Sequence, residues 1–149
     1  MKRDLSSMEK PENTHNSITF VVSTEERIRT ARYRGVVDDR LLLDAYSRLI
    51  TDCNFDPTLD DIVDLRDVSS FEITNNGLRR LVGMLAELDR FGFRTKVAIV
   101  AKDDVTFGMG RMYEIMRGMA ANSTEDIYIF REYDEALRWL CDSRVEQRT

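Results

Sequence analysis

The feature that most constrains the fold is a regular alternation of short β-rich runs and longer amphipathic segments, which begins at Ile18. Residues 97–101 (VAIVA) are continuously apolar, as is typical of a central strand covered on both faces. Between the β-rich runs, apolar residues recur every three or four positions, which predicts helices. The predicted strands are 18–23 (ITFVVS), 28–34 (IRTARYR), 62–65 (IVDL), 97–101 and 127–130 (IYIF). The predicted order of elements is therefore β-β-α-β-α-β-α-β-α.

The boundaries of these elements follow from residues that cap or break regular structure. We expect Gly35 to break the second strand, Pro57 to close the first helix and Gly92 to end the second helix in a left-handed conformation. The first three helices begin where a side-chain oxygen can accept a hydrogen bond from a free backbone N–H group. These capping positions are Asp38 or Asp39, Thr74 or Asn75, and Asp103 with Asp104, and the closing helix starts at Asp134.

Alternation of strands and helices calls for a mainly parallel sheet with right-handed crossovers. In such a sheet, the segments that follow the last three strands emerge together at the carboxyl edge, where ligands and partners usually dock. These segments are 66–73, 102–104 and 131–133. We divide the chain into an N-terminal tail (1–16), one domain (17–142) and a C-terminal tail (143–149).

Composition limits the classes of partner. The chain has 149 residues, with 22 Lys and Arg against 27 Asp and Glu, and a net charge of -5. Because nucleic-acid binding depends on clustered basic residues, we expect no nucleic-acid partner. No run approaches the roughly 20 apolar residues of a membrane span, and no signal peptide is recognisable. Cys53 and Cys141 lie far apart and form neither a CxxC pair nor a dense disulfide framework. Two such thiols are typical of proteins in a reducing compartment, so we expect a cytoplasmic protein.

Few residues in the chain are suited to catalysis. His15 is the only histidine and lies in the N-terminal tail, which argues against Ser-His-Asp and Cys-His catalysis and against most zinc sites. We interpret Asp60, Asp61, Asp64 and Asp67 as solvated loop ends and helix caps rather than as a carboxylate pair or a cation site. No glycine-rich phosphate loop precedes a helix. We therefore predict no enzymatic activity, no metal and no cofactor.

Three local motifs carry a resemblance to a known family. They are DIVDLRDVSS at 61–70, VAIVAKDDVTFGMGRMYEIM at 97–116 and DEALRWL at 134–140. With the predicted strand order, they make the chain similar to the STAS superfamily, and specifically to its SpoIIAA-like branch. The resemblance implies an α/β fold with a mostly parallel five-stranded sheet and four helices, related to CRAL-TRIO lipid-transfer domains.

The resemblance does not extend to the phosphorylation switch of the family. The anti-sigma antagonists in this superfamily carry an Asp-Ser-Ser-Gly-Leu motif with a phosphorylatable serine. Aligned on glycine and leucine, this chain reads Thr74-Asn75-Asn76-Gly77-Leu78, with asparagine at the phospho-acceptor position and a longer preceding loop. Asparagine can cap a helix but cannot be phosphorylated.

The predicted carboxyl edge suggests a first function, a regulatory or scaffolding interaction with another protein. The hydroxyl and amide side chains of this edge lie in the loop predicted to emerge there, together with Phe71. The predicted partner-binding residues are Ser69, Ser70, Phe71, Thr74, Asn75 and Asn76. Their alternative role is as ordinary turn and capping residues.

A methionine stripe suggests a second function, the binding or carrying of a small apolar ligand or lipid, with at most transient membrane contact. Met109, Met112, Met116 and Met119 follow one another at spacings of 3, 4 and 3 along the third helix. Methionine adapts to irregular surfaces and can line a pocket, although core packing is its commoner role. An exposed apolar surface of this kind is also compatible with a homodimer. The predicted apolar pocket, between this helix and the sheet, comprises Phe71, Phe107, Met109, Met112, Tyr113 and Met116.

Overall fold

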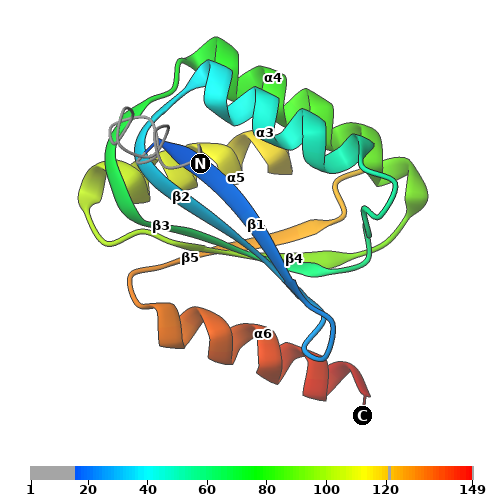
Figure 1. Ribbon diagram of the computed structural model, residues 1–149. Helices are drawn as coiled ribbons and strands as arrows, with labels where there is room; N and C mark the ends of the chain where they lie inside the picture. Colours follow the sequence, from blue (N-terminus) through cyan, green and yellow to red (C-terminus); the bar gives the residue numbers. More distant parts are fainter. Residues whose placement is uncertain (1–15, 121, 149) are drawn as a thin grey trace, which may run out of the picture.

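The predicted alternation of strands and helices is present in the computed structural model, which describes residues 16–120 and 122–148 (Figure 1). The residues before Asn16, including His15, lie outside the described part of the chain. The strands are β1 (Ser17–Ser23), β2 (Ile28–Asp38), β3 (Asp60–Glu72), β4 (Thr95–Val100) and β5 (Glu125–Phe130). The helices are α3 (Asp39–Thr51), α4 (Asn75–Ala86), the 3-10 helix η1 (Glu87–Phe91), α5 (Asp104–Gly118) and α6 (Tyr133–Arg148).

The five strands form one sheet in the order β1-β2-β3-β4-β5. Strand β1 pairs antiparallel with β2, and the other three pairs of neighbouring strands are parallel. Helices α3, α4 and α5 cover one face of the sheet, and α6 covers the other (Figure 1). This arrangement confirms the predicted α/β class, the mostly parallel sheet and the four α-helices.

Strands β2 and β3 are much longer than the sequence pattern predicts. Gly35 does not end β2: it adopts a positive φ of 74°, and the register with β3 shifts at this point, as in a β-bulge. Beyond the bulge, β2 runs to Asp38 and pairs with β3 as far as Glu72. Strand β4 pairs only with residues 61–64 of β3, so the later part of β3 pairs with β2 alone.

The loop predicted at 66–73 is therefore wrong over most of its length, because residues 66–72 belong to β3. Four-residue patterns such as IVDL reveal only the part of a strand that is buried on both faces. The later part of β3 is polar on its outer side, and its strand conformation depends on backbone hydrogen bonds to β2.

The predicted helix starts are confirmed at atomic level. Asp38, Thr74 and Asp103 each accept a hydrogen bond at the start of a helix, from backbone N–H groups of α3, α4 and α5 respectively. Gly92 is left-handed as predicted, with a φ of 76°, but it ends η1, which extends α4 by a 3-10 turn.

Two helix ends differ from the prediction. Helix α3 ends at Thr51, six residues before Pro57, where Asp52 adopts an extended conformation. Helix α6 begins at Tyr133 and continues to Arg148, through most of the segment that we predicted as a C-terminal tail after residue 142.

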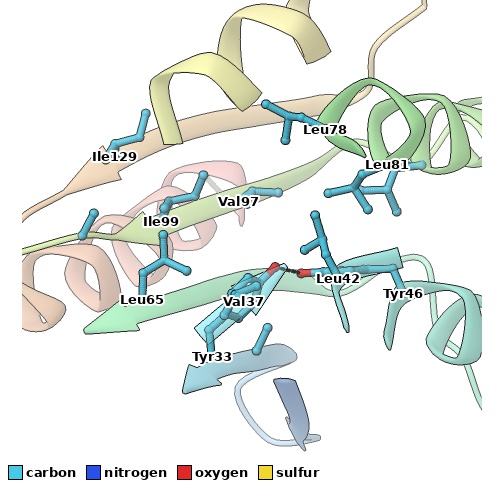
Figure 2. Close-up of a cluster of buried hydrophobic side chains, with 13 residues drawn as sticks. Tyr33, Val37, Leu42, Tyr46, Leu65, Leu78, Leu81, Val97, Ile99 and Ile129 are labelled. Atoms are coloured by element: carbon cyan, nitrogen blue, oxygen red, sulfur yellow. Dashed lines mark hydrogen bonds between the residues drawn. The ribbon is translucent and has the colours of Figure 1, made fainter. Parts of the chain in front are cut away.

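The sheet separates two hydrophobic cores. The three-helix core lies between the sheet and α3, α4 and α5, and Figure 2 shows Leu78 and Leu81 of α4 on the side of the sheet where Val97 and Ile99 of β4 lie. The α6 core lies on the opposite face. The buried residues of the three-helix core are Ala31, Tyr33, Val37, Leu42, Tyr46, Leu65, Leu78, Leu81, Leu85, Val97, Ile99, Ala101 and Ile129. Those of the α6 core are Ile28, Ile62, Ala98, Val100, Phe130, Ala136 and Leu140.

Candidate functional site

A partly open cavity of about 100 Å3 lies in the three-helix core. One ordered water needs roughly 10–15 Å3 of such space, so the cavity is large enough for a small organic molecule. Its wall comes mainly from helices α3, α4 and α5 and from strands β2, β3, β4 and β5, and most of it is apolar. The apolar lining residues are Leu42, Leu49, Ile50, Phe55, Val63, Leu65, Phe71, Ile73, Leu78, Leu81, Leu85, Leu88, Val97, Ile99, Met109 and Gly110.

Two tyrosines place a hydrogen-bonded hydroxyl pair in the wall of the cavity. The hydroxyl oxygens of Tyr33 on β2 and Tyr46 on α3 are 2.8 Å apart, and Figure 2 shows this contact. Burial raises the pKa of both tyrosines well above the ordinary value, so both hydroxyls stay neutral. Because one hydroxyl of the pair donates to the other, the second keeps a proton that it can donate to a ligand.

An ion pair forms a second polar part of the wall. Arg29 on β2 donates from Nε and a terminal nitrogen to the two carboxylate oxygens of Asp61 on β3, at 2.8 and 3.2 Å. Its other terminal nitrogen donates to the carbonyl oxygen of Asp56, and its guanidinium lies 4.9 Å from the centre of the Phe55 ring. Burial raises the pKa of Asp61, although the charge and hydrogen bonds of Arg29 act in the opposite direction.

A third polar group connects the end of α5 to the start of β5. The Glu125 carboxylate accepts hydrogen bonds at Oε1 from the Tyr113 hydroxyl (2.8 Å) and from Arg117 Nε (3.1 Å). The two terminal nitrogens of Arg117 donate to the carboxylate of Asp89 at 3.0 and 2.6 Å, and the Arg117 side chain is only 1% exposed. Burial raises the pKa of Glu125 above 4.5, against the opposing effects of Arg117 and Tyr113.

A surface groove of about 760 Å3 lies next to the cavity. It runs between β1 and α3 and is lined on its apolar side by residues such as Ile18, Phe20 and Leu41. Arg29, Leu49 and Phe55 line both the groove and the cavity. The segment between α3 and β3, which carries Phe55, therefore separates the interior from the surface at this point.

Half of the residues that we predicted for an apolar pocket line the cavity. Phe71, Met109 and Tyr113 contribute to the cavity wall. Phe107, Met112 and Met116 pack against the three-helix core without lining the cavity, and Met119 is 79% exposed. The main reason is that α3 and α4 together contribute more lining residues than α5, so the cavity lies among three helices rather than under α5 alone.

The predicted partner-binding residues are split between two elements. Ser69, Ser70 and Phe71 lie in β3, where Phe71 faces the cavity and its ring is 6.4 Å from that of Tyr33. Asn75 and Asn76 are exposed in the first turn of α4. Whether these residues contact a partner stays a prediction.

Thr74 has a structural role that the sequence pattern only partly indicates. Its hydroxyl donates to the Asp39 carboxylate at 2.5 Å and accepts from the backbone N–H of Gly77 at 3.0 Å, and its own N–H also donates to Asp39. A Cβ atom at Gly77 would overlap the Asp39 carboxylate, so a larger residue here would have to displace that side chain from its contacts with Thr74. Gly77 therefore leaves room for the contact between Asp39 of α3 and the start of α4.

The interpretation of the acidic cluster as solvated is wrong for two of its members. Asp61 lines the cavity, as described above. Asp64 is only 2% exposed and lies on the other face of the sheet, where Arg66 donates to both of its oxygens at 2.9 Å. Arg32 approaches the same carboxylate to 3.8 Å. Asp61 shares the strand face of Val63 and Leu65, and that alternation is the sequence signal that could have placed it in the interior.

The described residues contain no cluster of three or more His, Cys, Asp and Glu side chains that could hold a metal ion. Cys53 is exposed and Cys141 is partly buried, and neither is in a disulfide. Within residues 16–120 and 122–148, no helix has the length and hydrophobicity that crossing a bilayer requires.

Comparison with known proteins identifies the fold of the chain. No protein-family model and no curated protein sequence matches it. Among solved structures, it is similar to an uncharacterized protein of the DUF3478 family from Shewanella loihica, which has a SpoIIAA-like fold. The TM-score is 0.54 at 12% sequence identity, over 84% of this chain and 93% of the other. The chain therefore has a SpoIIAA-like fold, as the sequence motifs implied.

Proposed function

We propose that this protein is a non-enzymatic binding domain of the cytoplasm that holds a small, mainly apolar molecule in the cavity of the three-helix core. The cavity itself is the observation that carries this proposal, because protein interiors are normally packed as densely as organic crystals. At about 24 cal/mol per Å3, leaving 100 Å3 unfilled costs about 2 kcal/mol of stability. A ligand that fills the space offsets this cost.

The composition of the wall supports a ligand with an apolar body and a polar end. Leucine, isoleucine, valine and phenylalanine side chains make up most of the lining, and the tyrosine and carboxylate groups occupy separate positions on it. Such a mixture of apolar walls and a few fixed polar groups is typical of small-molecule sites. It differs from a catalytic arrangement, because each described carboxylate of the wall is engaged by an arginine.

The predicted protein interaction at the carboxyl edge is compatible with this function. Phe71 lines the cavity, whereas its neighbours Ser70 and Glu72 in β3 contact each other through an outward hydrogen bond. A ligand that displaces the Phe71 ring would therefore also move the strand segment that carries the predicted partner-binding residues. The carboxyl edge would then be a regulatory surface whose conformation changes when a ligand occupies the cavity.

Native mass spectrometry and thermal unfolding test the proposal together. We expect a bound mass after gentle purification, or an increase in the unfolding temperature when small aromatic probes such as toluene or indole are added. Val97→Leu narrows the cavity and should weaken both signals. Val100→Leu is the matched control, since it makes the same change three residues along β4 in the α6 core.

The proposal is wrong if the wild-type protein carries only its own mass and no apolar probe raises its unfolding temperature. It is also wrong if Val97→Leu and Val100→Leu reduce probe binding equally, because binding would then not take place in the cavity.

A further inference from the structure

We infer that the ligand of this cavity is a small apolar amine, whose ammonium group lies against the carboxylate of Glu125. The inference rests on the proposed function and adds the chemical class of the ligand. It follows from the charges around the cavity, the free acceptor on Glu125 and the lack of available cationic donors.

The charged groups in and behind the cavity wall do not balance. Three carboxylates, those of Asp61, Asp89 and Glu125, face two guanidinium groups, those of Arg29 and Arg117. Arg29 and Asp61 form a closed one-to-one pair. Arg117 is shared between Asp89 and Glu125, so this part of the wall has one more negative charge than positive charge when both carboxylates are ionised.

The unbalanced charge lies on Glu125, which lines the cavity. Both hydrogen bonds that the carboxylate accepts, from Tyr113 and Arg117, end on Oε1. Within the described part of the chain, Oε2 receives no hydrogen bond, and it is not a fully buried atom. Because Oε2 keeps its acceptor capacity on a residue of the cavity wall, it is the atom that we assign to the ammonium group of the ligand.

The charged groups of the wall disfavour anionic ligands such as fatty acids or phosphates. Every guanidinium nitrogen of Arg29 and Arg117 already donates to a carboxylate or carbonyl oxygen of the protein. An anion would therefore meet an uncompensated carboxylate without gaining a free cationic partner, which is unfavourable in a buried site. An ammonium group would instead form a charge-assisted hydrogen bond with the Glu125 carboxylate.

The direction of the pKa shift of Glu125 is consistent with this picture. Burial raises the pKa, because the interior disfavours the ionised carboxylate. An ammonium group that binds at Oε2 would favour the ionised form and lower this pKa.

Three probes of similar size test the inference on the wild-type protein. Benzylamine, toluene and benzoate share one ring and differ in the charge of the substituent. Isothermal titration calorimetry at pH 7 should find benzylamine the tightest by at least about tenfold, the effect of roughly 1.4 kcal/mol from one charge-assisted bond, and benzoate the weakest.

A pair of variants locates the preference. Glu125→Gln should abolish the advantage of benzylamine over toluene and leave the affinity for toluene within twofold. Asp126→Asn is the control: it removes the same charge at the next residue of β5, where Asp126 pairs with Arg94 and Lys96 on the outer surface. This variant should keep the preference for the amine.

The outcomes separate the inference from the function on which it rests. If none of the three probes binds, the cavity is not a ligand site and both are wrong. If toluene or benzoate binds as tightly as benzylamine to the wild-type protein, the amine class is wrong and the binding function stands. The wild-type comparison decides this even if Glu125→Gln fails to fold.

Discussion

On the α6 face of the sheet, Ala98, Val100, Ala136 and Leu140 have no exposed surface, whereas the other face of the same strands borders a cavity of about 100 Å3. Among the residues that the structure describes, none in the α6 core lines the cavity or the adjoining groove. Both faces are built from alternate residues of the same strands, so differences in sheet geometry cannot explain the contrast.

The comparison teaches that the two layers of this α/β fold are packed differently. One helix, α6, closes the simpler face with a small and fully packed set of apolar side chains. The other face needs three helices, and their side chains leave space and hold a charged network in the interior. We interpret the α6 core as the support and the three-helix core as the functional layer.

The largest expected effect comes from the charged network of the three-helix core. Arg117→Met should lower the free energy of unfolding by about 3–5 kcal/mol, because Asp89 and Glu125 would be left buried without a cationic partner. Denaturant unfolding at pH 7 measures this loss. Arg66→Met is the comparison on the α6 face, where Arg32 still faces Asp64, and should cost clearly less. Equal losses would contradict the special role of the network.

Truncation of leucines should distinguish the α6 core from the three-helix core. Leu140→Ala removes a side chain with no exposed surface and should cost about 3–5 kcal/mol, as in tightly packed interiors. Leu81→Ala should cost about 2–3 kcal/mol, since Leu81 already faces empty space and loses fewer contacts. Unfolding curves of the two variants give the comparison, and a larger loss for Leu81→Ala would argue that the cavity is not open.

Adding one methylene group should change stability in opposite directions on the two faces. Val97→Leu fills part of the cavity and should stabilise the ligand-free protein by about 0.8 kcal/mol. Val100→Leu adds the same group to a side chain with no exposed surface and should destabilise by about 1–3 kcal/mol. Thermal unfolding detects both shifts. Stability changes of the same sign in both variants would contradict the difference in packing between the two cores.

The smallest expected effect is a difference in pH dependence. Burial raises the folded-state pKa of Glu125 above its ordinary 4.5, so the wild-type protein should lose stability relative to Glu125→Gln as the pH rises above 4.5. Asp64 behaves in the opposite way: burial acts to raise its pKa, but hydrogen bonds and charges from Arg66 and Arg32 outweigh this and hold the pKa below 3.8.

Relative to Asp64→Asn, the wild-type protein should therefore have its full advantage above pH 3.8 and lose it as the pH falls further. Denaturant unfolding of the two variants and the wild type between pH 3 and 7 measures both trends. Parallel pH profiles for the two variants would show that the carboxylates on the two faces do not differ as described.

The fold could be predicted from the sequence because local patterns specify most of it. Continuous apolar runs such as 97–101 identify buried strands, and Asp38, Thr74 and Asp103 each cap the helix that they were expected to begin. The predicted site was less accurate. Periodicity identified Met109 and Tyr113 on α5, but the contribution of α3 and α4 to the cavity depends on how three helices pack over one sheet.

The sequence by itself determined the order of strands and helices, their caps and the parallel sheet, because these depend on patterns within a few neighbouring residues. Only the tertiary structure decided the extension of β3 along β2 and the buried pairs of Arg29 with Asp61 and Arg117 with Asp89. The partners in these pairs are 32 and 28 residues apart in the chain. Alternation along a strand can assign an acidic residue to the inner face, but only the arginine that folding brings to it makes burial of its charge favourable.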